Sequence, residues 1–198
     1  MGAGARGLRV VGMEDAVTQT SCVTFTLPFT PLHMGPALVI KAAGGRHFSV
    51  LIFGIAQVAM DIEPLVGIIR GWDVLHGWTH TYAGATLIGI AVFLFATPLC
   101  NLILRRWNCE LEHHKLHWLR SPEPVTRLAA ASGAFIGTYS HVLFDSLMHA
   151  DMLPLRPWSA NNALLGLMSI DTLYFACFIA GLAGVAIWFA RGYRNRRS

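Results

Sequence analysis

The sequence predicts an all-α, polytopic helical membrane protein of about five helices, the first two of which form an N-terminal helical hairpin. Hydrophobic residues make up 54% of the 198-residue chain and charged residues only 13%, and the mean hydropathy is +0.50. Soluble domains usually carry about 25% charged residues. The apolar residues are also gathered into long runs, which is typical of segments that enter a bilayer.

Each predicted helix is an apolar stretch with a recognisable end. The first is short and stops at Gly44-Gly45, where the second begins almost at once, so these two predict the hairpin. The others have about the 20 residues that a bilayer crossing needs. The stretches are residues 31–45, 47–69, 81–104, 128–150 and 166–190.

The chain divides into one domain and two flanking segments. Residues 27–190 form a single helical membrane domain, residues 1–26 a weakly ordered extension, and residues 191–198 a basic cytoplasmic tail. Acidic residues interrupt the start of the chain, which argues against a signal peptide. The 4 cysteines are scattered without a CxxC motif, which argues against a disulfide framework.

The distribution of Lys and Arg predicts the orientation. The net charge is +4, but the Arg residues flank apolar runs and no nucleic-acid-binding module is recognisable. Basic residues concentrate in the loop 105–127 and in the C-terminal tail, and Lys41 and Arg46 mark the hairpin tip. The positive-inside bias therefore predicts that these parts are cytoplasmic, in an inner or plasma membrane.

Polar residues gather at the opposite, non-cytoplasmic face once the spans alternate. They are His33, Asp61, Glu63, His76, His80, Asp145, His149 and Asp151. His141 lies about two helical turns further into the membrane than His149. Ionisable groups within a span are costly and usually face the bundle interior, where they pair or serve a function.

His141, Asp145 and His149 recur at every fourth position, which predicts one polar helix face. Metal ligation and a structural Asp–His hydrogen bond both fit this row. His76 and His80 have the same spacing and, on a helix, would share a face able to grip one metal ion; an interfacial pair beside Trp72 and Trp78 also fits.

Two further elements add oxygen and nitrogen ligands. In Asp61-Ile-Glu63-Pro64, Pro64 disfavours helix at the preceding residue, so the carboxylates are expected where a helix ends, as ligands or as polar caps. Pro31 is suited to the first turn of a helix, which positions His33 near its start.

Mixed oxygen and nitrogen ligation suits zinc, manganese or iron. A different interpretation is that His76 and His80, together with His113, His114 and His117, form the histidine boxes of a membrane di-iron hydroxylase. The predicted sidedness puts the last three across the membrane from His76, in a solvated loop. The HExxH motif of zincin proteases is absent.

The stretches PFTPLHMGPALVIKA, QVAMDIEPL, LHGWTHTYAGATLIG and SHVLFDSLMHADMLPL resemble a family of small membrane-bound, metal-dependent hydrolases. The resemblance covers about residues 27 to 170. The ligand order is also distantly similar to that of zinc-dependent phospholipase C, whose final His-x3-Glu pair has no match here. These likenesses imply a phosphoester substrate, including a lipid. They also imply a physiological start at Leu27, where the family begins with Met.

We therefore expect a membrane-embedded metal-dependent hydrolase that binds one or two divalent ions, zinc above all. A metal-bound hydroxide would attack an ester or phosphodiester presented from the bilayer. Glu63, Asp151 and His149 are predicted as bases or as partners of the ligands. The predicted ligands are His33, Asp61, His76, His80, His141 and Asp145.

Two non-hydrolytic interpretations remain open from the sequence. An ion or proton carrier would need polar groups at several depths of the bundle, and the last span offers few. An accessory subunit of a membrane complex would need a face of small residues for close packing, as at Gly181 and Gly184. The sequence leaves open whether that face meets a partner or its own neighbours.

Overall fold

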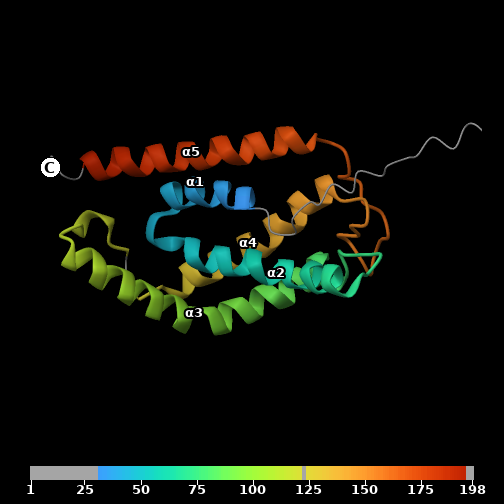
Figure 1. Cartoon of the computed structure of the whole chain (residues 1–198), viewed down its shortest axis with the longest axis horizontal. Coiled ribbons are helices and arrows are strands. Elements are labelled where there is room, and N and C mark those ends of the chain that lie inside the picture. Colours follow the sequence, from blue (N-terminus) through green and yellow to red (C-terminus); the bar gives the residue numbers. More distant parts are fainter. Residues whose placement is uncertain (1–30, 122–123, 195–198) are drawn as a thin grey trace, which may run out of the picture.

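The computed structural model describes residues 31–121 and 124–194, in which five α-helices and no strand occur. The predicted all-α class is thus confirmed. The α-helices are α1 (Gly35–Gly44), α2 (Val50–Arg70), α3 (Tyr82–His113), α4 (Arg127–Met148) and α5 (Ile170–Arg194), and the 3-10 turns are η1 (Pro31–Met34), η2 (Gly45–His47), η3 (Trp78–His80) and η4 (His117–Leu119) (Figure 1). The predicted extension 1–26 lies outside the described residues.

Helices α1 and α2 form the predicted hairpin. Gly45 ends α1 with a φ of 52°, which glycine adopts readily, and Ser49 caps α2 by accepting a hydrogen bond from the Ile52 N–H. Lys41 closes the turn by donating to the carbonyl oxygens of Gly45 and Phe48, both at 2.8 Å. With 10 residues, α1 is about 15 Å long, which is too short to cross a hydrocarbon core of about 30 Å.

Three helices, α2, α3 and α5, are long and apolar enough to cross a membrane. Helix α4, over the predicted stretch 128–150, is of similar length but less apolar than these three, as its predicted polar row implies. The reason is its composition of small and polar residues, which suits an interior position: α4 packs against both α2 and α3. At Gly137 a Cβ atom would lie 2.7 Å from the Ala56 side chain, so the small residues permit the close approach to α2.

Helix α3 continues well beyond the predicted span 81–104. No glycine or proline occurs between Arg105 and His113, and the helix therefore extends to His113 through the first part of the predicted loop. The hydroxyl of Thr81 caps its start by accepting from the Gly84 N–H at 2.9 Å.

Helix α5 lies alongside α1 as an outer layer (Figure 1). A Cβ atom at Gly184 would lie 2.4 Å from the Leu38 carbonyl carbon, so the two backbones are in contact there. The small-residue face of α5 therefore meets a neighbour within the same chain. The helix runs to Arg194, which makes residues 191–194 of the predicted tail helical; residues 195–198 lie outside the described part.

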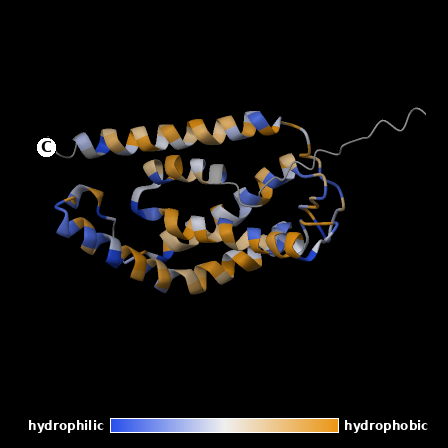
Figure 2. Ribbon diagram, viewed as in Figure 1, coloured by the Kyte–Doolittle hydropathy of each residue, from blue (hydrophilic) through white to orange (hydrophobic). Residues whose placement is uncertain are grey.

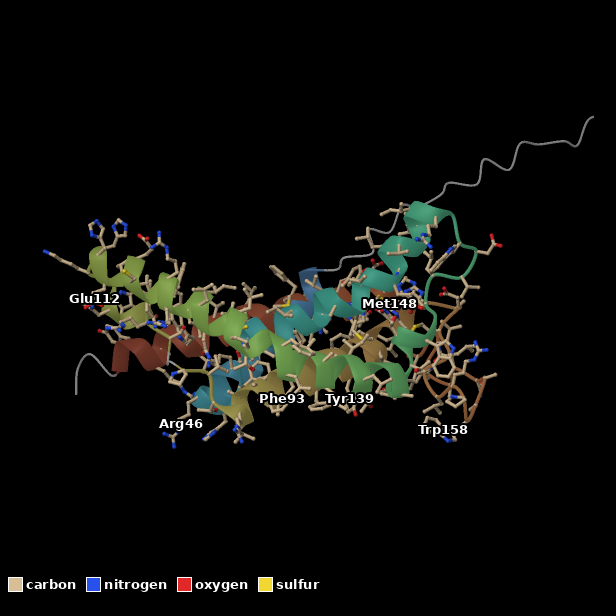
Figure 3. All side chains as sticks on the ribbon, turned by 90° about the horizontal axis from the view of Figure 1, so that it is seen from below. Arg46, Phe93, Glu112, Tyr139, Met148 and Trp158 are labelled. Atoms are coloured by element: carbon tan, nitrogen blue, oxygen red, sulfur yellow. The ribbon has the colours of Figure 1, made fainter. Side chains whose placement is uncertain are left out.

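Hydrophobic residues cover the middle of α3 and α5, and hydrophilic ones gather toward the two ends of the molecule (Figure 2). Large apolar side chains on the long helices are exposed, including Phe95 (76%) and Leu87 (70%) on α3. Arg46 and Glu112 lie toward one end and Met148 and Trp158 toward the other (Figure 3). The fold thus has a lipid-compatible girdle between two polar ends.

Candidate metal centre

Acidic and imidazole side chains converge where the C-terminal halves of α2 and α4 meet η3, toward the end of the molecule that Met148 marks in Figure 3. We call this group the His–Asp cluster. It comprises Asp61, His76, His80, His141 and Asp145. Among the described residues, these side chains form two of the three sets that lie close enough together to hold one metal ion. The third set is His76, His149 and Asp151.

Helix α4 supplies two buried members, His141 and Asp145, one turn apart. The Nε2 atom of His141 lies 3.1 Å from Oδ2 of Asp145, and their side chains are 3% and 7% exposed. The predicted row ends there, because α4 stops at Met148 and His149 follows as its C-cap with extended backbone. His149 therefore does not share the helical face of the other two residues.

Helix α2 supplies Asp61, whose Oδ1 lies 3.3 Å from the His141 Nε2 atom. The expectation that α2 ends before Pro64 was wrong: the helix continues through Pro64 to Arg70. Pro64 is buried on the face of α2 that packs against its neighbours, and packing of this kind maintains a helix across a proline. The two carboxylates therefore project from within a helix, Asp61 toward α4 and Glu63 toward η3.

The His76–His80 segment also differs from the prediction. These residues are not on one α-helix: His76 lies in the irregular segment after α2, and His80 ends the 3-10 turn η3. Gly71, with a φ of 68°, ends α2 and redirects the chain toward the cluster. Both imidazoles nevertheless reach it, with Nε2 of His80 at 3.5 Å and Nε2 of His76 at 4.0 Å from Asp145 Oδ2.

The tautomer of His141 is fixed by Gln57, a buried residue one turn before Asp61 on α2. The Gln57 Oε1 atom lies 2.6 Å from Nδ1 of His141, while its amide nitrogen donates to the Gly137 carbonyl and to the Ser140 hydroxyl. These two acceptors orient the amide so that Oε1 faces the ring. The His141 Nδ1–H therefore donates to Gln57, and its Nε2 presents a lone pair to the cluster.

The tautomer of His80 is fixed in the same sense by Thr79 and Glu63. Oε2 of Glu63 accepts hydrogen bonds from both the backbone N–H and the hydroxyl of Thr79. Because that hydroxyl donates to Glu63, its oxygen is left to accept the Nδ1–H of His80 at 2.9 Å. The Nε2 lone pair of His80 then also points into the cluster.

His76 is held by Asp151. Nδ1 of His76 lies 2.8 Å from Oδ1 of Asp151, whose other oxygen accepts the backbone N–H groups of Leu75 and His76. Burial alone would raise the pKa of Asp151, but the His76 imidazole and these N–H groups hold the pKa below its usual value. All three imidazoles therefore have an oxygen acceptor at Nδ1, the pattern by which proteins orient metal-binding histidines.

The remaining predicted base, His149, stacks on His76 with ring centroids 4.3 Å apart. Burial lowers the pKa of His149, and the neighbouring His76 lowers it further. Glu63 and Asp151 make the contacts of residues that orient ligands, which was one of their two predicted roles. A role of any of the three as a base stays a prediction.

His33 lies beside the cluster but in none of the three sets. Its ring is 2% exposed and makes an edge contact with His141 at a centroid distance of 6.0 Å. Its Nε2 atom is buried without a hydrogen-bond partner. Burial lowers the pKa of His33 to about 4, so the ring is neutral at physiological pH. Direct ligation by His33 stays a prediction.

The alternative histidine set at the end of α3 is remote from this site. His113 and His114 lie at the C-terminal end of α3, the helix that begins two residues after His80, and both are exposed, as is His117. They make no set with His76 or His80 among the residues that the structure describes.

Sequence reasoning missed Gln57 and Thr79. Neither titrates, and neither belongs to a ligand motif. Gln57 has a signal in retrospect: it precedes Asp61 by one helical turn and so shares its face, and a polar amide is unusual within an apolar run.

The side chains of the cluster face one another with hydrogen-bond acceptors and no donor between them. Three Nε2 lone pairs meet two carboxylates in a largely buried site, so a divalent cation could satisfy them together. No protein family model, curated protein or solved structure matches this chain.

Proposed function

We propose that the protein is a membrane-embedded metal-dependent hydrolase whose His–Asp cluster binds one or two divalent ions, zinc above all. Neutral imidazoles and carboxylates are the ligands of catalytic zinc, while manganese and iron accept the same set. Two ligands of a tetrahedral zinc at about 2.0–2.2 Å from the metal lie about 3.3–3.6 Å apart. Three separations centred on His141 and His80, at 3.1, 3.3 and 3.5 Å, fall near that range.

The observation that carries the proposal is the pair of Nε2 atoms of His80 and His141, which lie 3.3 Å apart. Their Nδ1 hydrogens are committed to Thr79 and Gln57, so in the neutral rings neither Nε2 atom carries a proton for the other. Two facing lone pairs repel unless a cation lies between them or a ring takes up a second proton. A metal also satisfies Asp61 and Asp145, which one extra proton does not.

A divalent ion at this position would polarise a carbonyl or phosphoryl oxygen and lower the pKa of water to permit attack near neutral pH. The chain's own residues then have distinct roles. Gln57, Thr79 with Glu63, and Asp151 orient the three imidazoles. His149, stacked on His76 at the edge of the site, is the residue we assign to proton transfer with the reacting ester.

The substrate class we propose is an ester or phosphodiester, including that of a lipid. The family resemblance supports a phosphoester. Exposed tryptophans near the cluster, Trp72, Trp78 and Trp158, support a position at the membrane interface, where lipid headgroups lie. The remaining three tryptophans, Trp107, Trp118 and Trp188, belong to the other end of α3, the turn η4 and the end of α5.

Turnover tests the hydrolase assignment. Purified protein loaded with zinc is incubated with bis(p-nitrophenyl) phosphate, a p-nitrophenyl ester and phospholipid vesicles. We expect metal-dependent hydrolysis of at least one substrate, lost in Asp145→Asn and retained in His113→Ala, whose side chain is exposed and remote. A zinc-bound protein that hydrolyses none of them would leave a metal-binding protein that is not a hydrolase of these classes.

We also propose that the cluster faces the non-cytoplasmic side of an inner or plasma membrane, as the positive-inside bias indicates. Cys109, exposed on the basic end of α3, provides a probe. In a Cys22→Ser background, a membrane-impermeant maleimide should label Cys109 in inverted vesicles but not in intact cells. Ser159→Cys, at the other end and combined with Cys109→Ser, should give the opposite pattern. Labelling of Cys109 from outside intact cells reverses the orientation.

The accessory-subunit interpretation loses its main support. The small-residue face of α5 is the surface that such a subunit would offer to a partner. Gly184 on that face is buried, and its backbone meets α1 of the same chain. The face is therefore used within the protein.

A further inference from the structure

A second site lies at the end of the molecule opposite the His–Asp cluster. A half-open cavity of about 730 Å³ is enclosed by the hairpin tip, the C-terminal halves of α3 and α5 and the start of α4. Its volume is within the range of about 300–1,000 Å³ that small-molecule sites occupy. Nothing in the proposed hydrolytic function uses this cavity.

The cavity exists because neighbouring helices end at different levels. The hairpin turns at Gly45, while α5 continues to Arg194 and α3 to His113 (Figure 1). Leu104 and Trp107 on α3 and Trp188 on α5 therefore extend past the hairpin tip and wall a space that the short α1 does not fill.

Positive charge lines one part of this cavity. Its lining includes Lys41 and Arg46 and contains no Asp or Glu among the described residues. Arg46 is exposed and makes no ion pair or side-chain hydrogen bond within the part of the chain that the structure describes. Lys41 uses two of its three N–H groups on backbone carbonyls, which leaves one for a ligand.

The same wall contains the first residues of two helices. Ser49 caps α2 and Thr126 caps α4, and both line the cavity. The N-terminal ends of helices carry partial positive charge and add to the potential that the two cationic side chains create. Charge complementarity thus specifies an anionic group at this wall.

The rest of the lining is apolar. Leu38, Phe48, Leu51, Leu104 and Val185 present hydrocarbon, and Trp107 and Trp188 present indole rings at the level where aromatic side chains mark a membrane interface. A free inorganic phosphate would leave this surface uncovered. An acyl chain would cover it while its headgroup reached Arg46 and Lys41.

We infer that this cavity binds a phospholipid with an anionic headgroup, one acyl chain lying in the apolar part and the phosphate at Arg46 and Lys41. Basic pockets between membrane helices on the cytoplasmic side recognise such headgroups. The site is separate from the His–Asp cluster, so the bound lipid is not the proposed substrate at that cluster. It would fill the space between the hairpin tip and the longer helices α3 and α5.

Native mass spectrometry of the delipidated full-length protein tests this inference, by titration with phosphatidylglycerol, phosphatidylcholine or inorganic phosphate. We expect one phosphatidylglycerol per chain to bind at least fivefold more tightly than phosphatidylcholine. Arg46→Ala should weaken that binding about fivefold, as the loss of one basic side chain at a membrane surface does. Arg106→Ala is the matched control, because Arg106 is exposed but does not line the cavity.

A second variant tests the apolar part. Val185→Trp fills the cavity from an exposed position on α5 and should abolish the tight phosphatidylglycerol adduct without changing zinc content. Equal binding of the two lipids overturns the inference, as do equal effects of Arg46→Ala and Arg106→Ala. Undiminished binding to Val185→Trp also overturns it, and inorganic phosphate that binds as tightly as phosphatidylglycerol shows an anion site instead of a lipid site.

Discussion

Nε2 of His80 and Nε2 of His141 lie 3.3 Å apart although they come from η3 and α4 and are separated by 61 positions in the sequence. Each ring is oriented by the hydrogen bond that its Nδ1–H donates, to the Thr79 hydroxyl oxygen in one case and to Gln57 Oε1 in the other. The buried Gln57 and the half-buried Thr79 therefore direct two lone pairs at one point. Hydrogen bonds of this kind orient metal-binding histidines in proteins, and the two rings belong to groups of side chains close enough to hold one metal ion.

Gln57 provides the most specific test of this arrangement. In Gln57→Leu, the Nδ1–H of His141 loses its acceptor, and the ring can take the tautomer that points a proton at Asp145. We expect zinc affinity to fall about 10–100-fold, the usual effect of removing a partner of a ligand. Competition with a zinc chelator measures it.

Gln57→Glu is the matched control, because a carboxylate oxygen can still accept from Nδ1. Its zinc affinity should stay within a fewfold of wild type. If Gln57→Leu and Gln57→Glu bind zinc as tightly as wild type does, Gln57 does not orient His141 in the metal-bound protein.

The buried imidazole of His33 should make the stability of the folded protein depend on pH. Burial lowers its pKa from 6.5 to about 4, so between these values the unfolded chain binds a proton that the folded protein does not. The folded state is therefore favoured above about pH 6.5 and loses stability as the pH falls toward 4, by about 3 kcal/mol in total.

Thermal unfolding of chelator-treated protein between pH 7 and pH 4 measures the effect of His33. His33→Leu removes the titrating group and keeps an apolar side chain against Phe144, whose ring lies 5.2 Å from that of His33. Its melting temperature should fall less steeply with acid than that of wild type. Parallel curves for the two proteins are the contrary result.

The sequence predicted the members of this site better than their setting. His141 and Asp145 were predictable because one helical turn separates them, and their polarity stands out in an apolar stretch. The paths of α2 and the 71–80 segment were not. Pro64 lies inside a helix because tertiary packing maintains it, and His76 reaches Asp145 through an irregular segment whose direction is set at Gly71.

The sequence likewise predicted the all-α class of the fold, but not which helices lie in its interior. Hydropathy identified the apolar helices, yet it could not tell that α4 is an interior helix, because small residues lower its hydropathy while allowing the closest packing. The sequence also could not identify the helix that packs against Gly184, since the same small-residue pattern permits contacts within a chain and between chains.

The α1–α5 contact gives a stability prediction with an internal control. In Gly184→Ala the new methyl group would lie 2.4 Å from the Leu38 backbone, so the helices must separate, and we expect a loss of about 1–3 kcal/mol. In Gly181→Ala the nearest atom is 3.4 Å away, and the change should be neutral or stabilising, since alanine favours helix by about 1 kcal/mol. Thermal unfolding in detergent distinguishes the two. Equal effects would mean that α1 and α5 do not pack as described.

Metal content tests the central claim most directly. The protein is purified through a tag without histidine, in buffers with no added metal or chelator, and its zinc, manganese and iron are measured by inductively coupled plasma mass spectrometry. We predict at least one divalent ion per chain in wild type and in the control His113→Ala, and less than about a tenth of that in His141→Ala and in the isosteric Asp145→Asn, because each loses a ligand from a site that needs about four. Wild-type protein that carries no metal and takes up none when zinc is supplied would contradict the account, as would full metal content in folded His141→Ala and Asp145→Asn.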